Sequence, residues 1–118
     1  TEVTDYRIVL NSKIIVIGSP SRFWNMSWEL KRMFDEVFEK IYIAHKNEFR
    51  QKKILAYSMA EYGGSAELTN KMIATAIGDC GNRLDTSIIL ITKKTPEEYQ
   101  KQCEGFSMYI ESLLKTTE

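Results

Sequence analysis

Three short apolar runs, each followed by a helical pattern, constrain the fold of this chain more than any other feature. The runs lie at residues 14–17, 53–59 and 87–91. After each run, apolar residues recur at spacings of three and four, as they do on one face of an α-helix. Strands that alternate with helices form parallel sheets with right-handed crossovers and helices on both sides. The chain is therefore predicted to be an α/β protein with a parallel sheet of three strands.

The three helical patterns can be placed along the chain from their start and stop signals. The first covers residues 28–41 and the second residues 66–80, with Gly81 as a plausible stop just past its end. The third begins at Thr95 and Pro96, because threonine is a typical N-cap and proline suits the first helical position. It then runs to the end of the chain, with its apolar residues at helical spacing.

The remaining segments carry weaker signals. Residues 1–13 are interpreted as a short helical turn or an irregular lead-in to the first strand, and residues 42–52 as a surface loop that holds His45. Gly105 lies inside the third helix, where glycine costs about 1 kcal/mol relative to alanine. We therefore expect a close packing contact at Gly105 that requires the absence of a side chain.

Composition excludes several classes of function. The 118 residues fit one domain, 1–118, and 16 basic residues balance 16 acidic ones without a basic stripe, so nucleic-acid binding has no electrostatic support. No apolar run approaches the roughly 18 residues of a membrane helix. Cys80 and Cys103 lack metal-site spacing, so free thiols in a cytoplasmic protein are expected. A single histidine, His45, argues against a histidine-rich metal site and a Ser-His-Asp triad.

Two loops are the candidate functional segments. Gly18 and Pro20 are predicted to end the first strand, and Ser27 is placed to cap a helix that begins at Trp28. After the second strand, a glycine pair at residues 63–64 signals a tight turn. Ligands of open α/β sheets bind outside the carboxyl ends of the strands, where both loops would form two walls of one crevice. The alternative is that the first loop only connects a strand to a helix.

The first loop resembles a motif of the flavodoxin-like superfamily, closest to the FMN-dependent NAD(P)H:quinone reductases of the tryptophan-repressor-binding-protein type. That family has Gly-Ser-Pro-Thr-Arg-Phe-Gly-Asn-Met-Ser, and this chain has Gly18-Ser19-Pro20-Ser21-Arg22-Phe23-Trp24-Asn25-Met26-Ser27. The helix start at residues 30–35 is similar too, and residues 63–67 match the family's glycine-rich turn more weakly. The chain departs from the family at Trp24 and Glu61, each of which stands where the family has glycine. At Trp24 this change either alters a backbone conformation suited to glycine or adds an aromatic wall.

The resemblance implies an FMN site in which the first loop holds the flavin ring and ribityl chain and the second flanks the ring. The flavin carries the chemistry, NAD(P)H is the co-substrate, and no side chain is assigned a catalytic role. Alternatives for the first loop are that its two aromatic residues cap the core, that its arginine faces solvent, and that its asparagine stabilises the loop. The cofactor-binding residues that the resemblance implies are Pro20, Ser21, Arg22, Phe23, Trp24, Asn25, Ala60, Glu61, Tyr62, Gly63 and Gly64.

The resemblance also implies that half of the fold is missing. Flavodoxin-like sheets have the strand order 2-1-3-4-5, and the three strands of this chain match strands 3, 4 and 5. No Ser/Thr-rich phosphate loop precedes Ile14. The strand at residues 14–17 would then be an apolar edge that needs a cover. In order of preference, that cover is a missing N-terminal segment, a second copy in a homo-oligomer, or a separate partner chain.

Three functions are compatible with these observations. The first is an FMN-binding, NAD(P)H-dependent oxidoreductase that passes electrons to a quinone or a similar small acceptor. The second is a flavodoxin-type one-electron carrier, although such carriers tend to be strongly acidic and this chain has a formal charge of zero. The third is a cofactor-free flavodoxin-like subunit that serves in interaction or assembly, which the missing phosphate loop favours.

Overall fold

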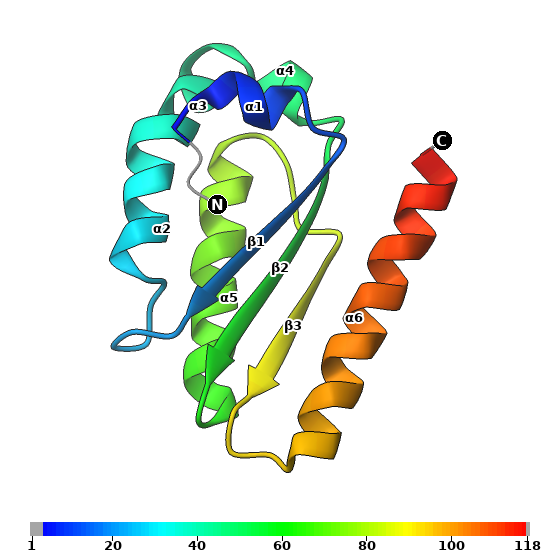
Figure 1. The fold of residues 1–118 in the computed structure, drawn as a ribbon. Coiled ribbons are helices and arrows are strands. Elements are labelled where there is room, and N and C mark those ends of the chain that lie inside the picture. Colours follow the sequence, from blue (N-terminus) through cyan, green and yellow to red (C-terminus); the bar gives the residue numbers. More distant parts are fainter. Residues whose placement is uncertain (1–3, 118) are drawn as a thin grey trace.

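Three parallel strands, in the order β1-β2-β3, form the centre of the fold (Figure 1). In the computed structural model, which describes residues 4–117, they are β1 (Ile14–Pro20), β2 (Lys53–Ala60) and β3 (Thr86–Ile91). The register pairs Val16 with Leu55 in the first ladder and Met59 with Leu90 in the second. The prediction of three parallel strands is confirmed, and β2 lies between the other two.

Helices cover both faces of the sheet, as predicted. One face carries α2 (Trp28–Met33), the π-helical turn η1 (Phe34–Phe38), α3 (Glu39–Ala44) and α5 (Gly63–Asp79). The other face carries α6 (Pro96–Thr117), which packs mainly on β3 (Figure 1). Side chains alternate between the two faces of a strand. Ser58 of β2 accordingly hydrogen-bonds Asn70 of α5, whereas the neighbouring Tyr57 packs edge-on against Phe106 of α6.

The hydrophobic core lies on the α2 and α5 side of the sheet. Ile17, Ile54 and Ala56 point into it from the strands and meet apolar side chains of η1, α3 and α5. Three core phenylalanines are in contact. The Phe34 and Phe38 rings are 4.9 Å apart, and the Phe38 and Phe49 rings are 5.6 Å apart. Burial of such side chains contributes roughly 1.5–3 kcal/mol each, so this layer supplies most of the stability.

Phe49 also explains why residues 42–52 differ from the predicted surface loop. Two further short helices are present: α1 (Tyr6–Leu10) lies before β1, and α4 (Lys46–Phe49) lies between α3 and β2. Phe49 is fully buried against the core, which holds its segment in a helical turn. The prediction of a loop is therefore wrong for α4 and for the end of α3, whereas the short helical turn predicted within residues 1–13 is confirmed by α1.

The first strand is longer than predicted, because Gly18 and Pro20 do not end it. The Ser21 amide donates to the Met59 carbonyl, so the ladder continues through residue 20. Amide groups alternate in direction along a strand, so the nitrogen of Pro20 points away from β2 and no ladder hydrogen bond is lost there. At Gly18, an added Cβ would lie 2.0 Å from the Tyr57 ring, so glycine is needed there for close packing.

Two other glycine predictions are corrected. The pair at residues 63–64 forms the first turn of α5, which begins three residues earlier than predicted. At Gly105 nothing lies within 4 Å of an added Cβ, so the packing contact expected there is absent.

Helices on both sides of the sheet would cover β1 on both faces, but one face of β1 is partly open. Val16 is 42% exposed on the α6 side, whereas its neighbour Ile17 is buried on the α5 side. The difference arises because α6 packs mainly over β3 and leaves the α6 side of β1 open.

The contrast between two glycines gives a stability test. Gly18→Ala should lower the free energy of unfolding by about 1–3 kcal/mol, because the methyl group displaces the Tyr57 ring from a packed position. Gly105→Ala should raise it by about 1 kcal/mol, because alanine is the better helix former and the site is open. Urea denaturation of both variants measures this difference, and equal effects would contradict the assigned packing.

Candidate functional site

The loops that follow β1 and β2 lie side by side at the carboxyl edge of the sheet. Loop 1 is residues 21–27, and loop 2 is residues 61–62. Ser21 binds to the elements on either side of loop 2, because its amide donates to the Met59 carbonyl of β2 at 2.8 Å and its Oγ donates to the Ser65 carbonyl of α5 at 3.2 Å. The Thr69 hydroxyl of α5 lies 3.0 Å from the Ser21 Oγ. The predicted neighbourhood of the two loops is therefore confirmed, and Ser21 is its main link.

The tip of loop 1 is a tight turn with two left-handed residues. The Arg22 amide donates to the Asn25 carbonyl at 2.8 Å, and the Asn25 amide donates back to the Arg22 carbonyl at 3.0 Å. Between them, Phe23 has φ 48° and Trp24 has φ 68°. Two consecutive positive φ values are characteristic of a type I′ turn, which normally takes asparagine or glycine. Trp24 thus keeps the backbone conformation that suits glycine and adds an exposed aromatic ring.

The base of loop 1 is fixed by three side-chain hydrogen bonds. The Asn25 Oδ1 accepts from the Met26 amide at 2.7 Å, and the buried Ser19 Oγ accepts from the Ser27 amide at 2.8 Å. Ser27 Oγ in turn accepts from the Leu30 amide, which confirms the predicted N-cap of α2. The Asn25 side chain therefore stabilises the loop, as one of the alternatives proposed.

The aromatic residues of the two loops are exposed. Phe23 is 100% exposed, Trp24 60% and Tyr62 65%, so Phe23 and Trp24 do not cap the core. The Trp24 ring lies against the first turn of α5, 3.6 Å from the position of a Cβ added to Gly64. Trp24 and Gly64 are thus the two predicted site residues that meet across the gap between the loops. Most of the Trp24 side chain remains exposed.

A lysine that the sequence analysis did not select completes this edge. Lys93 follows β3, and its Nζ lies 3.2 Å from the Tyr62 hydroxyl and 4.0 Å from the Glu61 carboxylate. Tyr62 is the N-cap of α5 but makes no side-chain hydrogen bond to it. The Glu61 carboxylate balances the charge of the Lys93 ammonium, so the first amides of this 17-residue helix are the groups that favour negative charge at this edge. Lys93 could have been found from its position directly after the third parallel strand.

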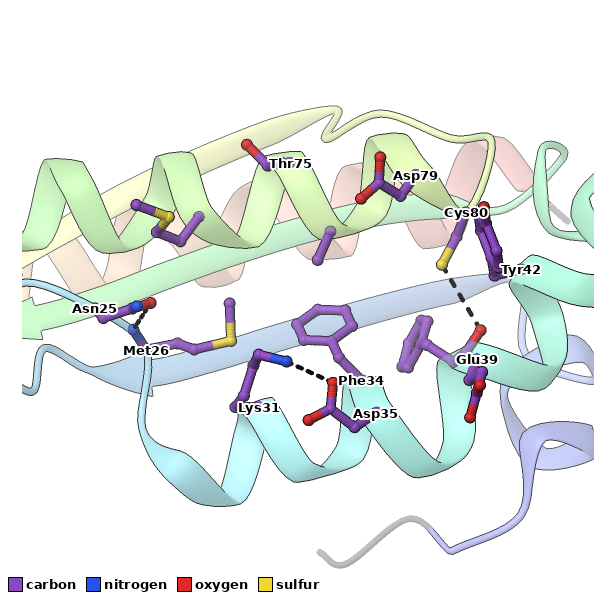
Figure 2. Close-up of a pocket in the computed structure, with 13 residues that line it drawn as sticks. Asn25, Met26, Lys31, Phe34, Asp35, Glu39, Tyr42, Thr75, Asp79 and Cys80 are labelled. Carbon is purple, nitrogen blue, oxygen red and sulfur yellow. Dashed lines mark hydrogen bonds and ion pairs between the residues drawn. The ribbon is translucent and has the colours of Figure 1, made fainter.

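A separate groove of about 740 Å³ runs between α5 and the α2–α3 segment (Figure 2). The exposed Lys31–Asp35 ion pair lies on one wall, and Cys80 lies at the far end from Asn25. Burial raises the pKa of the Cys80 thiol, which also hydrogen-bonds the Phe38 carbonyl. A buried thiol with a raised pKa is a poor nucleophile, so Cys80 has a packing role. Asn25 is the only predicted site residue that lines this groove.

A second groove, of about 610 Å³, follows the outer side of β1 beneath α2. Its lining includes Ile15, Val16 and Gly18 from the strand and the exposed Trp28 from the helix.

Among residues 4–117 no cluster of three or more His, Cys, Asp or Glu could hold a metal ion. No helix in the same part of the chain is long and apolar enough to cross a membrane.

Comparison with known proteins identifies the fold. No family model matches the chain, and no curated protein matches it. Among solved structures, the chain is similar to the Trp repressor binding protein from Bacillus subtilis, with a TM-score of 0.61 and 12% sequence identity. The similarity covers 71% of this chain and 58% of that one. The predicted flavodoxin-like sheet, reduced to three strands with their helices, is confirmed as the fold.

The turn in loop 1 gives a test of backbone strain. Phe23→Asn should raise the free energy of unfolding by about 0.5–1 kcal/mol, because asparagine tolerates the left-handed conformation and the exposed ring makes no packing contribution. Phe23→Ala is the matched control, since it removes the ring but keeps the strain, and it should not stabilise. Thermal unfolding distinguishes the two variants. Equal stability would show that the turn is not strained at residue 23.

Proposed function

We propose that this chain forms the ring-binding part of an FMN site in an NAD(P)H-dependent oxidoreductase that reduces a quinone or a similar small acceptor. The observation that carries the proposal is that the Trp24 ring lies beside the first turn of α5, 3.6 Å from where a Cβ on Gly64 would be, at the carboxyl edge of neighbouring parallel strands. This edge is where open α/β sheets bind their ligands. The fold shared with the Trp repressor binding protein also supports it.

The exposed aromatic residues fit a flat heterocyclic ring. Trp24 and Tyr62 are exposed aromatic residues of the two loops, and α5 begins with a glycine pair directly after Tyr62. Aromatic pairs prefer offset stacking, with energies of roughly 0.5–1.5 kcal/mol beyond the burial of area. Loop 1 is held rigid by the hydrogen bonds of Ser21, Asn25 and Ser27, so little entropy is lost when a ring binds.

The charges at this edge suit a ring that gains negative charge. When bound, the flavin supplies hydride and electron transfer between reduced nicotinamide and the acceptor. The first amides of α5 favour negative charge beside the loops, whereas the Lys93 ammonium is paired with Glu61 and hydrogen-bonded to the Tyr62 hydroxyl. The proposal assigns the walls of the ring site to this chain. It assigns no phosphate ligands, because no Ser/Thr-rich loop precedes Ile14.

Substitution at Gly64 tests the ring site. A leucine there should displace the Trp24 indole, because an added Cβ already reaches 3.6 Å from it. We expect Gly64→Leu to weaken FMN binding at least ten-fold, as measured by quenching of FMN fluorescence, without loss of helix stability. Gly78→Leu is the matched control, because it lies in the same helix with open space around it. Equal FMN affinity of the two variants would contradict the site.

Turnover tests the reaction class. The wild-type protein with FMN should oxidise NADH or NADPH in the presence of a benzoquinone, as followed by absorbance. Protein that stays colourless after incubation with FMN would overturn the proposal and favour the cofactor-free interaction subunit instead. Bound FMN without nicotinamide oxidation would favour the one-electron carrier.

A further inference from the structure

Loop 2 lies beside the end of β3, because the second parallel ladder continues beyond its paired strands (Figure 1). The Thr92 amide donates to the Ala60 carbonyl at 2.9 Å, and the Thr92 Oγ1 donates to the same carbonyl at 3.3 Å. The next residue on one side is Lys93, and the next two residues on the other side are Glu61 and Tyr62. The backbone of two strands therefore places Lys93 against loop 2.

Lys93 donates a hydrogen bond to the side chain of Tyr62. Its Nζ lies 3.2 Å from the Tyr62 Oη and 5.2 Å from the centre of the Tyr62 ring. An ammonium group has hydrogen-bond donors and no acceptor, so the Tyr62 oxygen accepts this bond. The hydroxyl hydrogen of Tyr62 takes no part in the bond and can be donated to a ligand. The Glu61 carboxylate lies 4.0 Å from the same Nζ and holds the ammonium beside loop 2.

We propose that Tyr62 gives a proton to the quinone oxygen, and that Lys93 is the residue that positions the Tyr62 hydroxyl. This step rests on the proposed function. A quinone becomes a hydroquinone when it takes up a hydride and a proton, and the hydride of the proposed reaction carries both electrons. The O–H bond of Tyr62 breaks as an O–H bond forms on the quinone oxygen. The electron pair of the broken bond stays on the Tyr62 oxygen.

The surroundings of the Tyr62 oxygen stabilise the negative charge that this transfer leaves on it. The hydrogen bond from Lys93 then joins a cation to an anion, which makes it stronger. Tyr62 is also the N-cap residue of α5, and the first amides of a helix favour negative charge nearby. Tyr62 is 65% exposed, so water restores its proton after each transfer.

Two other groups that take part in proton transfer in many enzymes lie elsewhere in this fold. His45, the only histidine of the chain, is the N-cap residue of α4, at the end of the sheet opposite loop 2 (Figure 1). Cys80 follows the last residue of α5, whereas Tyr62 precedes the first one, and burial raises the pKa of the Cys80 thiol. Tyr62 is therefore the proton donor that loop 2 offers.

Two electron acceptors separate proton transfer from electron transfer. Ferricyanide takes up electrons without a proton, whereas benzoquinone needs both. With FMN and reduced nicotinamide, the ratio of benzoquinone turnover to ferricyanide turnover should fall at least ten-fold in Tyr62→Phe, which keeps the ring and removes the proton. Tyr42→Phe is the matched control and should keep the wild-type ratio. Tyr42 is another exposed tyrosine beside a lysine, with the Lys46 Nζ 4.4 Å from the centre of its ring.

Substitution of Lys93 tests its positioning role. Lys93→Met should lower the same ratio, because it removes the hydrogen bond to the Tyr62 hydroxyl. Lys93→Arg still donates such a bond and should restore most of the ratio. An unchanged ratio in Tyr62→Phe, or equal ratios in the two Lys93 variants, would overturn this step alone. A wild-type protein that oxidises reduced nicotinamide with neither acceptor would overturn the proposed function, and this step with it.

Nuclear magnetic resonance of the protein without FMN tests the contact independently of turnover. The chain has six tyrosines, so tyrosine labelled with ¹³C at Cζ gives few signals, and Tyr62→Phe identifies the signal of Tyr62 by its loss. Lys93→Met should shift the Tyr62 signal and leave the Tyr42 signal in place. A Tyr62 signal that does not move would show that Lys93 does not bond to the hydroxyl, and would overturn the proposal.

Discussion

The parallel ladder between β1 and β2 is the constraint on which the rest of this structure depends. Its register places the carboxyl ends of β1 and β2 side by side. The hydrogen bond from the Ser21 amide to the Met59 carbonyl continues the ladder into loop 1. Because both strands point the same way, loops 1 and 2 are forced to the same edge of the sheet. The position of the Trp24 ring beside Gly64 follows from this placement.

The rigid base of loop 1 allows its tip to hold an unfavourable conformation. A left-handed backbone costs roughly 1–2 kcal/mol for a residue with a side chain, and the tip contains two such residues in sequence. The hydrogen bonds of Ser19, Asn25 and Ser27 below the tip fix the turn. Backbone strain that the surrounding structure maintains is found at ligand-binding and switch regions. The strained turn of loop 1 therefore agrees with the proposed role of its aromatic rings in binding a flat ring.

Sequence patterns predicted the strands and the helix caps, because these depend on local periodicity and hydrogen bonding, and the family resemblance implied the strand order. The Ser27 cap is an example, since its role requires only the three residues that follow it. The patterns failed where tertiary contacts decide the outcome. The sequence predicts a loop at Phe49, yet burial of Phe49 against Phe38 holds this segment in α4. The sequence also predicts that Gly18 ends the strand, whereas the Tyr57 ring, 39 residues further along, gives Gly18 a packing role within β1.

The candidate site was predicted to a similar extent. The family motif located loop 1, and the alternation of strands and helices located loop 2 beside it. The sequence could not show that Trp24 would retain a glycine-like backbone. The hydrogen bonds at the base of loop 1, such as that from the Ser27 amide to Ser19 Oγ, offset the free-energy cost of this conformation. It also missed Lys93, whose relevance depends on its distance from Tyr62 and not on any motif.

The π-helical turn η1 makes the helical segment after loop 1 tolerant of the loss of one residue at that place. A turn of this kind holds one residue more than an α-helical turn, and it joins two α-helical parts without changing their relative phase. Loss of one exposed residue within residues 34–38 would therefore convert the turn to regular α-helix and keep Ile41 in the interior. The same loss within α2 or α3 would rotate the residues beyond it by about 100°, because those helices hold no extra residue.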